Sequence, residues 1–500
     1  MTALYALIPI LVVLLLMLIF KLGSYLAGLA GWLAGLLIAA LAFGLNWQVL
    51  WISQVKGLLL AANVLYILWT ALFLYHLADQ AGGVRAIAQA LQRLIPDTGW
   101  LIIILAWMFT GMLENIAGFG LPITIGAPML VTMGVPPVIA VAAAAIGHSW
   151  AVTASGMALA FRALADITHT DQAALFPDTA ILLGITILLT GLASAWILGQ
   201  LKHWRKVILL GLIVAATLAV TGLIGLISIS SYIAAIVGVL AGILLGRKPA
   251  NWKPIKEKNE FLLSGVLTYG FLIAAIMAVT LIKPVNTFLA QFTWTLAFPA
   301  ATSRLGFTTP AGNGYLFRFL LHPGTFILLT SVVSLFLFPR IKGYQVGKAG
   351  IALKRTLKSV IPPTLGTLFM IGLATLMEHT GMSLQLAQGV SNLVGSVYPL
   401  FAALIGMAGT FVTGSNTNSN VLFGILQKNV AELLKLSPLV ILSAQTVGGA
   451  LGSMIAPAKL AIGSSTTAVK GQEGEILRGT LPIALVSVMI VGLAALLLAL

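Results

Sequence analysis

Two short clusters of polar and glycine residues interrupt otherwise apolar stretches of the sequence. The first runs Glu-Asn-Ile-Ala-Gly-Phe-Gly-Leu-Pro over residues 114–122, and the second runs Thr-Gly-Ser-Asn-Thr-Asn-Ser-Asn over residues 413–420. Amides and hydroxyls can bind a small polar solute or a hard cation, and a carboxyl group can also carry a proton. The two clusters therefore predict ligand-binding sites, because water-exposed loops do not occur inside apolar stretches of this kind.

Three ionisable residues are candidates for proton or anion chemistry, since a charge at membrane depth costs roughly 2.5–3.5 kcal/mol. Glu114 opens the first cluster and is interpreted as a proton carrier or ion ligand, or else as a carboxylate satisfied by neighbouring N–H groups. Lys459 follows Pro457 by two residues and can anchor a carboxylate, pair with Glu114 or extend to the membrane surface. His148 lies in another apolar stretch, where it either titrates or has a structural role.

Other kinds of chemistry find little support in the composition. Cysteine is absent and the six histidines are scattered, so we expect neither a metal site nor a cofactor. An enzyme would need a nucleophile–base pair or metal ligands at the clusters, and no Ser/His/Asp set occurs there. The net charge of +15 is better explained by cytoplasmic loops rich in Lys and Arg than by binding of nucleic acid.

The elements that position these residues are predicted to be membrane helices. The chain is 60% hydrophobic and 8% charged, whereas a soluble domain carries about 25% charged residues. Apolar runs of roughly 17–25 residues predict an all-α protein with about 12 transmembrane helices in the cell membrane. The predicted spans are 3–20, 24–43, 57–77, 137–161, 178–199, 207–227, 230–246, 261–282, 322–338, 360–377, 438–462 and 480–500.

Clusters of basic residues predict the orientation of these spans. The clusters lie at 202–206, 247–258, 340–358 and 470–478. Placing all four in the cytoplasm satisfies the positive-inside rule and the parity of the intervening spans. Residues 162–178 and 283–321 then lie outside. The second of these segments is too polar for a span, and we expect it to be an external or partly re-entrant connector.

The two stretches that contain the polar clusters, 99–134 and 398–434, are predicted to be re-entrant helical hairpins. A half-helix of about 13 residues rises only about 20 Å, which is too short to cross the roughly 30 Å hydrocarbon core. Helix starts are predicted at Pro122, at Ser419 and Asn420, at Thr153 and Ser155, and at Pro457. Such starts attract a carboxylate, whereas the opposing helix ends suit a cation, so the charge of the substrate stays open.

The sequence also contains an internal repeat. Residues 136–161 align without gaps on residues 437–462, with a central glycine in each (Gly147 and Gly448) and a helix-breaking residue nine positions later (Gly156 and Pro457). The predicted topology opens the first hairpin to the cytoplasm and the second to the outside, so the repeats are inverted. Inverted repeats with discontinuous helices are typical of secondary transporters, whereas a duplicated bundle would need the glycines only for packing.

The repeat predicts four parts of the chain. They are N-terminal helices (1–45), a first inverted repeat (46–200) with the hairpin 99–134, connecting helices (201–339), and a second inverted repeat (340–500) with the hairpin 398–434.

At its polar clusters the chain resembles the L-lactate permease family of bacterial and archaeal secondary transporters. Residues 114–120 are similar to the family's Glu-Gly-Ala-Ala-Gly-Phe-Gly tip, and residues 413–423 to its Thr-Gly-Ser-Asp-Thr-x-Ser-Asn tip followed by Leu-Phe. A Gly-Gly-x-x-Gly-x-Met-Ile-x-Pro run matches residues 448–457. The resemblance implies proton-driven uptake of a carboxylate, typically lactate or glycolate.

Three residues depart from the family pattern. Asn416 stands in place of an aspartate, Asn115 in place of a glycine, and Lys459 where the pattern has an uncharged residue. The predicted site is therefore less acidic and more basic than the pattern.

These observations predict a set of site residues and partners. The predicted substrate-binding residues are Asn115, Gly118, Gly120, Ser155, Ser415, Asn416, Thr417, Asn418, Ser419, Asn420 and Lys459, and the predicted proton-coupling residues are Glu114 and His148. We expect the lipid bilayer, a small carboxylate and a proton as partners, and a homo-oligomer is compatible with the sequence. The alternatives are a sodium-coupled transporter of another organic anion and a membrane-embedded enzyme.

Overall fold

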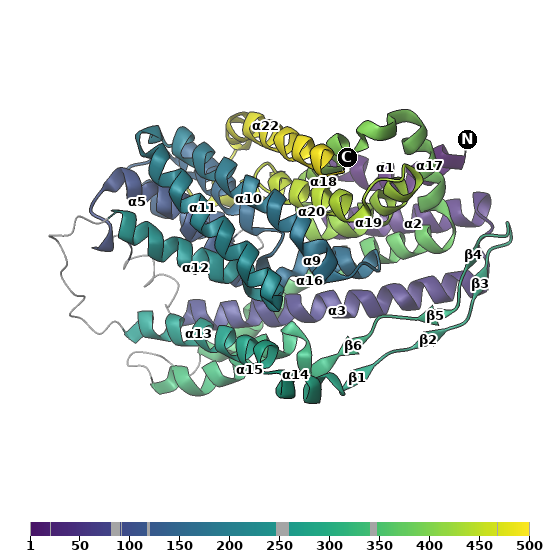
Figure 1. Ribbon diagram of the computed structural model, residues 1–500, viewed down its shortest axis with the longest axis horizontal. Coiled ribbons are helices and arrows are strands. Elements are labelled where there is room, and N and C mark those ends of the chain that lie inside the picture. The colour runs from purple at the N-terminus through teal and green to yellow at the C-terminus, as the bar shows by residue number, and fades with distance from the viewer. Residues whose placement is uncertain are drawn as a thin grey trace.

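The computed structural model is built almost entirely from helices that run along one long axis of the molecule (Figure 1). It describes residues 2–20, 22–81, 91, 93–117, 121–246, 260–340, 348–467 and 469–499. Within these residues, nine helices are long and apolar enough to cross a membrane, or up to eleven when each of two bent pairs counts as one span. The predicted all-helical membrane fold is confirmed.

Helices account for most of the described residues. In chain order they are α1 (Thr2–Leu18), α2 (Ser24–Ala42), α3 (Trp47–Gln80), α5 (Thr98–Ile104), α6 (Thr110–Ala117), α7 (Leu121–Thr132), α8 (Pro137–His148), α9 (Ser155–Ile167), α10 (Gln172–Ile197), α11 (Trp204–Thr221), α12 (Ile227–Gly246), α13 (Glu260–Leu281), α14 (Lys283–Ala290), α15 (Pro323–Leu337), α16 (Lys348–His379), α17 (Met382–Val394), α18 (Tyr398–Thr413), α19 (Asn416–Leu433), α20 (Pro438–Gly452), α21 (Pro457–Thr466) and α22 (Glu473–Ala499). Short 3-10 or π segments are η1 (Leu105–Phe109), η2 (Ser149–Ala151), η3 (Leu201–His203), η4 (Gly222–Leu226), η6 (Phe319–Leu321), η7 (Phe338–Arg340) and η8 (Gly395–Val397).

Side-chain caps fix several helix starts. Asn46 accepts a hydrogen bond from the Val49 N–H at 2.9 Å, so α3 begins ten residues before the predicted span. Asp171 caps α10 in the same way, through the Ala174 N–H at 2.9 Å. Each cap satisfies an N–H group that the first helical turn leaves without a partner.

Both predicted hairpins are present as antiparallel helix pairs. In the first, α5, η1 and α6 form the entering arm and α7 returns, and a Cβ atom on Gly126 of α7 would lie 2.6 Å from the Thr110 methyl carbon of α6. In the second, α18 enters and α19 returns, with the Ser419 hydroxyl donating to the Gly406 carbonyl at 2.9 Å. Residues 118–120, at the tip of the first hairpin, lie outside the described residues.

Each broken span packs through its central glycine against the entering arm of its own hairpin. A Cβ atom on Gly147 would lie 1.8 Å from the Ala106 carbonyl oxygen, and one on Gly448 would lie 1.9 Å from the Ala403 carbonyl oxygen. No side chain fits at either position, because such distances lie far inside van der Waals contact. The aligned glycines therefore have equivalent surroundings in the two repeats.

The two broken spans lie antiparallel beside each other. His148 Nε2 is 3.1 Å from the Ser453 hydroxyl oxygen, and the Thr153 hydroxyl donates to the Thr446 carbonyl at 2.8 Å. Residue numbers thus increase along one span in the direction in which they decrease along the other. Two matching segments in this arrangement run through the membrane in opposite directions, as inverted repeats do.

The connector between α14 and α15 forms a β-hairpin, here called the arm, which the sequence analysis did not predict. Its strands are β1 (Thr293–Trp294), β2 (Ala297–Phe298), β3 (Ala301–Thr302), β4 (Thr308–Thr309), β5 (Gly312–Asn313) and β6 (Phe317–Arg318). They pair antiparallel as β1 with β6, β2 with β5 and β3 with β4. The arm extends beside α3 to the start of that helix (Figure 1), where the Arg304 N–H donates to the Gly44 carbonyl at 2.7 Å.

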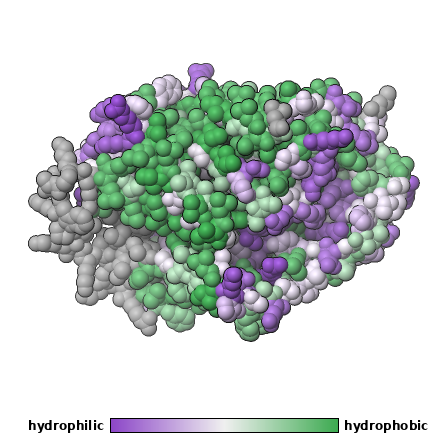
Figure 2. Space-filling model, in the orientation of Figure 1, coloured by the Kyte–Doolittle hydropathy of each residue, from purple (hydrophilic) through white to green (hydrophobic). Residues whose placement is uncertain are grey.

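The surface reflects the membrane environment. Figure 2 shows a broad hydrophobic surface over most of the helices and a hollow in which hydrophilic residues gather, on the side of the molecule near the arm. The whole of the predicted basic cluster 247–258 lies outside the described residues, as does the part of the cluster 340–358 that covers residues 341–347.

Candidate functional site

A small cavity of about 60 Å³ lies where the hairpins and the broken spans meet. It is called the central cavity below. Its lining comes from both predicted repeats, with α3 in the first, and consists of Ile67, Leu68, Ala71, Glu114, Val152, Ser155, Gly156, Leu159, Ala160, Gly414, Ser415, Asn416, Thr417 and Lys459. Residues far apart in the chain thus share one polar space inside an apolar protein.

Two helix starts face the central cavity. Asn416 is the first residue of α19 and Lys459 is the third residue of α21, whereas Ser155 precedes the left-handed residues at the start of α9. Unpaired N–H groups and the helix dipole make such starts favourable for an anion. The predicted caps Ser419 and Asn420 were wrong, because α19 begins earlier and Ser415 caps it.

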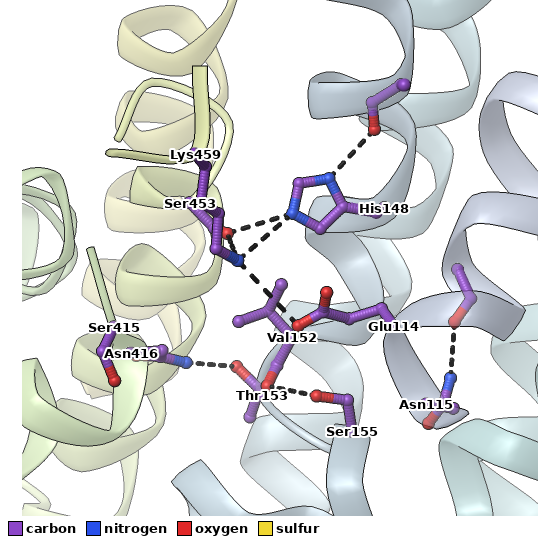
Figure 3. Close-up of polar contacts among 12 residues, drawn as sticks. Glu114, Asn115, His148, Val152, Thr153, Ser155, Ser415, Asn416, Ser453 and Lys459 are labelled. Carbon is purple, nitrogen blue, oxygen red and sulfur yellow. Dashed lines mark hydrogen bonds and ion pairs between the residues drawn. The ribbon is translucent and has the colours of Figure 1, made fainter. Parts of the chain in front are cut away.

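The carboxylate of Glu114 and the ammonium of Lys459 form an ion pair in the cavity wall. Glu114 Oε1 is 3.9 Å from Lys459 Nζ, and both side chains are buried (Figure 3). Lys459 Nζ also donates to the Ser453 hydroxyl. The other carboxylate oxygen of Glu114 has no hydrogen-bond partner among the described residues, so the carboxyl group retains a free acceptor.

His148 lies behind Lys459 rather than in the cavity lining. Its Nδ1 is 2.9 Å from the Ala144 carbonyl, and its Nε2 is 3.4 Å from Lys459 Nζ (Figure 3). Since a carbonyl only accepts, the ring proton is on Nδ1 and the lone pair of Nε2 faces the lysine and Ser453. The histidine thus accepts a hydrogen bond at the back of the lysine.

The tip of the second hairpin contacts the break of the first repeat. The Asn416 amide nitrogen is 3.3 Å from the Thr153 hydroxyl oxygen and 3.0 Å from the Thr446 carbonyl oxygen. The amide oxygen of Asn416 is buried and has no hydrogen-bond partner among the described residues. This contact mirrors the ion pair, in which the first hairpin contacts the break of the second repeat.

The backbone at the first break is left-handed over three residues. The φ angles are +54° at Gly156, +64° at Met157 and +59° at Ala158. Only glycine adopts this region freely, and each of the other two residues costs about 1–2 kcal/mol. Such strain is typical of functional sites, and here it adjoins the central cavity.

Several predicted site residues lie outside the central cavity. The Asn115 amide donates to the Gly111 carbonyl at 2.8 Å and faces the Ser231 carbonyl at 3.4 Å. Ser419 bonds within its own hairpin, and the Asn420 amide joins the Ala160 carbonyl at 2.9 Å. These contacts hold helices together. Gly118 and Gly120 lie outside the described residues.

Other residues of the site were missed in the sequence. The Ser453 hydroxyl accepts a hydrogen bond from Lys459, and the Thr446 carbonyl accepts one from Asn416. Both residues belong to an apolar span whose sequence indicates helix packing rather than a binding site. The position of Ser453, four residues before the break at Pro457, is the one signal that pointed to it.

A larger cavity of about 470 Å³ adjoins the central cavity. It shares Ser415, Thr417 and Lys459 with the central cavity and also contains Asn418, whose amide oxygen accepts from the Thr367 hydroxyl at 3.1 Å. It reaches His76 and Ser359, in the half of the molecule that the positive-inside rule assigns to the cytoplasm. The predicted topology thus places this approach to Lys459 on the cytoplasmic side.

Comparisons with known proteins agree with this architecture. A family model described as L-lactate permease matches residues 2–500. The chain is 28% identical to the L-lactate permease of Streptococcus iniae over 87% of this chain and 92% of that protein. It is 24% identical to the glycolate permease GlcA of Escherichia coli (strain K12), over 99% and 95% of the two chains.

A solved structure supports the fold. The YdaH transporter of Alcanivorax borkumensis superposes with a TM-score of 0.53 at 16% identity, over 90% of this chain and 87% of that one. Because the family model spans nearly the whole sequence, the chain belongs to the L-lactate permease family and is a multi-pass membrane transporter rather than an enzyme.

Proposed function

We propose that the protein couples the uptake of a small monocarboxylate, such as lactate or glycolate, to the inward movement of a proton. The relatives named above are permeases for these two acids. The observation that carries the proposal is the Glu114–Lys459 ion pair in a cavity faced by two helix starts.

Charge balance links the anion to the proton. Glu114 and Lys459 are the ionisable side chains among the described cavity-lining residues, and their charges cancel. A carboxylate that enters adds one negative charge to a buried site, which costs several kcal/mol unless it is compensated. A proton on Glu114 removes that cost, because it leaves the Lys459 ammonium free to pair with the substrate.

The substrate carboxylate would lie between Lys459 and the start of α19. There the ammonium, the free N–H groups of the first helical turn and the hydroxyls of Ser415 and Thr417 act as donors. The cavity of about 60 Å³ holds roughly four to six water molecules at 10–15 Å³ for each. That size fits an acid of two or three carbon atoms. In this proposal the hairpins and the broken spans that surround the substrate belong to the two inverted repeats, residues 46–200 and 340–500.

One proton for each anion also satisfies the energetics of uptake. A monovalent anion that enters a cell with a negative interior works against about 2.3 kcal/mol per 100 mV. Adding one proton makes the step electroneutral, so the membrane potential no longer opposes accumulation. The pH gradient then supplies the driving force.

Proteoliposomes under an imposed pH gradient, without sodium, test the proposal. Wild-type protein should accumulate labelled lactate, and Glu114→Gln should lose accumulation while it retains exchange of labelled for unlabelled lactate. Glu432→Gln changes an exposed carboxylate on α19 and is the matched control, which should behave as wild type. Accumulation by Glu114→Gln, or accumulation that requires sodium, would contradict the proposal.

A further inference from the structure

A third cavity, of about 580 Å³, lies on the other side of α9 from the central cavity. It is called the outer cavity below, because the positive-inside rule places it on the external half of the protein. The volume falls in the range of about 300–1,000 Å³ that is usual for ligand sites. Its polar lining includes Arg162, Ser228, Asn286, Tyr315 and Arg318.

The two cavities are separated by a single turn of backbone. Gly156 lines the central cavity, whereas the next residue, Met157, lines the outer cavity. Both belong to the left-handed turn at the start of α9. A solute in the outer cavity is therefore adjacent to the segment that forms the wall of the substrate site.

The outer cavity contains two guanidinium groups, of which that of Arg162 interacts electrostatically with the Asp166 carboxylate and bonds to the Tyr315 hydroxyl. Arg162 Nη1 donates to the Ser228 hydroxyl at 3.3 Å, whereas its Nε is buried and has no hydrogen-bond partner among the described residues. Arg318 reaches the same space from strand β6 of the arm and is exposed. In the part of the chain that the structure describes, no ion pair within 4.0 Å joins either arginine to a carboxylate.

The carboxylates of this cavity are already engaged elsewhere. An oxygen of Asp166 accepts from the Asn63 amide at 2.9 Å, and one of Asp171 accepts from the Ala174 N–H at 2.9 Å as the cap of α10. His322 is also engaged, since its Nδ1 accepts from the Gly324 N–H at 3.1 Å and its Nε2 bonds to Asn63. Among the described residues, the Nε–H of Arg162 and the exposed guanidinium group of Arg318 thus remain available as donors to a ligand in this cavity.

We propose that the outer cavity is a capture site that holds a small carboxylate before it passes to the central cavity. A guanidinium group matches a carboxylate with two parallel hydrogen bonds, and a buried Nε–H without a partner is one half of such a pair. Arg318 adds positive charge at the entrance and raises the local concentration of anions. This proposal rests on the proposed carboxylate transport, but it concerns only the external approach.

Kinetics measured from each side of the membrane separate a capture site from the central site. The experiment uses lactate uptake by right-side-out vesicles and lactate transport by inside-out vesicles. Arg162→Gln and Arg318→Gln should each raise the external KM by roughly tenfold, the low end of the effect of a charged cleft. The KM measured from the cytoplasmic side should stay unchanged, because the solute does not enter through the outer cavity. Arg304→Gln, at the tip of the same arm, is the matched control and should change neither value.

Three outcomes would overturn the capture site. An external KM that stays as in wild type in both variants would show that the arginines hold no substrate. Equal changes from both sides would place their effect at the central site or on folding. An effect that disappears in vesicles made only of phosphatidylcholine would assign the cavity to the phosphate of an anionic lipid.

A binding measurement keeps the capture site separate from the proposed function. In detergent, lactate should raise the melting temperature of Lys459→Met, whose central site is weakened, and the added change Arg162→Gln should abolish that rise. If wild-type protein transports no monocarboxylate, the proposed function fails. The rise in melting temperature of Lys459→Met with lactate then still shows whether the outer cavity binds a carboxylate. No rise with Lys459→Met would contradict the capture site.

Discussion

Glu114 of the first hairpin and Lys459 of the second broken span lie 3.9 Å apart, although most of the chain separates them in sequence. The reciprocal contact joins Asn416 of the second hairpin to Thr153 of the first broken span at 3.3 Å. Each hairpin therefore meets the break of the opposite repeat. The site exists only where the two repeats cross.

Replacing Lys459 with methionine should weaken substrate binding. The change Lys459→Met keeps most of the side chain's length and removes its charge, so lactate affinity should fall by about 1.5–3 kcal/mol, the value of a charge-assisted hydrogen bond. Isothermal titration calorimetry measures the change directly. Lys435→Met, at an exposed lysine after α19, should bind as wild type. Equal affinity in a folded Lys459→Met protein would mean that the lysine only balances Glu114.

The two tip asparagines should respond differently to alanine. Asn416→Ala should raise the KM for the substrate, because Asn416 lines the central cavity. Asn115→Ala should leave the KM unchanged and lower the thermal stability by about 1 kcal/mol, because it removes the hydrogen bond to the Gly111 carbonyl. Uptake kinetics and melting curves of both variants provide the comparison. A large KM effect from Asn115→Ala would place that residue in the substrate site after all.

The central glycines of the two broken spans should be equally intolerant of a methyl group. In Gly147→Ala and Gly448→Ala the new Cβ atom meets a carbonyl oxygen at under 2 Å, so each should lose at least about 1–3 kcal/mol of stability. Gly270→Ala in α13 is the control, since no atom lies within 4 Å of its Cβ position, and it should gain up to about 1 kcal/mol. Melting temperatures in one detergent test all three. Tolerance of either central alanine would contradict the equivalent packing of the repeats.

Acid should destabilise the start of the first hairpin. Burial raises the pKa of Asp97, but the Trp100 N–H and His203 outweigh burial and hold that pKa below its ordinary value of 3.8. A lowered folded-state pKa means that the stabilisation is present above the ordinary value and is lost as the pH falls through the folded value. The melting temperature of wild type should therefore fall more between pH 5 and pH 3 than that of Asp97→Asn, which keeps a capping oxygen. Equal falls would show that this carboxylate does not couple stability to pH.

Much of the fold could be predicted because the membrane imposes strong and local rules. Long apolar runs indicate helices, and a polar cluster such as residues 413–420 inside one indicates a break. The same reasoning singled out Glu114 and Lys459, because an ionisable group at depth needs a partner or a function. The sequence left open whether Lys459 pairs with Glu114 or extends to the membrane surface, because the distance between the two side chains depends on the fold.

The features that the sequence did not reveal depend on contacts between distant segments. The strands of the arm are two residues long, too short for the alternating pattern that indicates a strand. The start of α19 was placed too late, because Ser415, Ser419 and Asn420 are all residue types that cap helices. Methionine and alanine rarely adopt a left-handed backbone, so the residue types at 157 and 158 do not predict it. The packing of the surrounding structure has to impose this conformation.

The crossing of the repeats has a consequence for biosynthesis. The chain is made from its N-terminus, so Glu114 enters the bilayer long before Lys459 has been translated. Lys459 belongs to the second broken span, which among the described elements is followed by α22. Until that span is inserted, the Glu114 carboxyl group lacks the charged partner that it has in the folded protein. Completion of the ion pair is thus a late event in synthesis, and a ribosome stalled before α21 would leave a nearly complete chain in which Glu114 lacks the lysine that it pairs with.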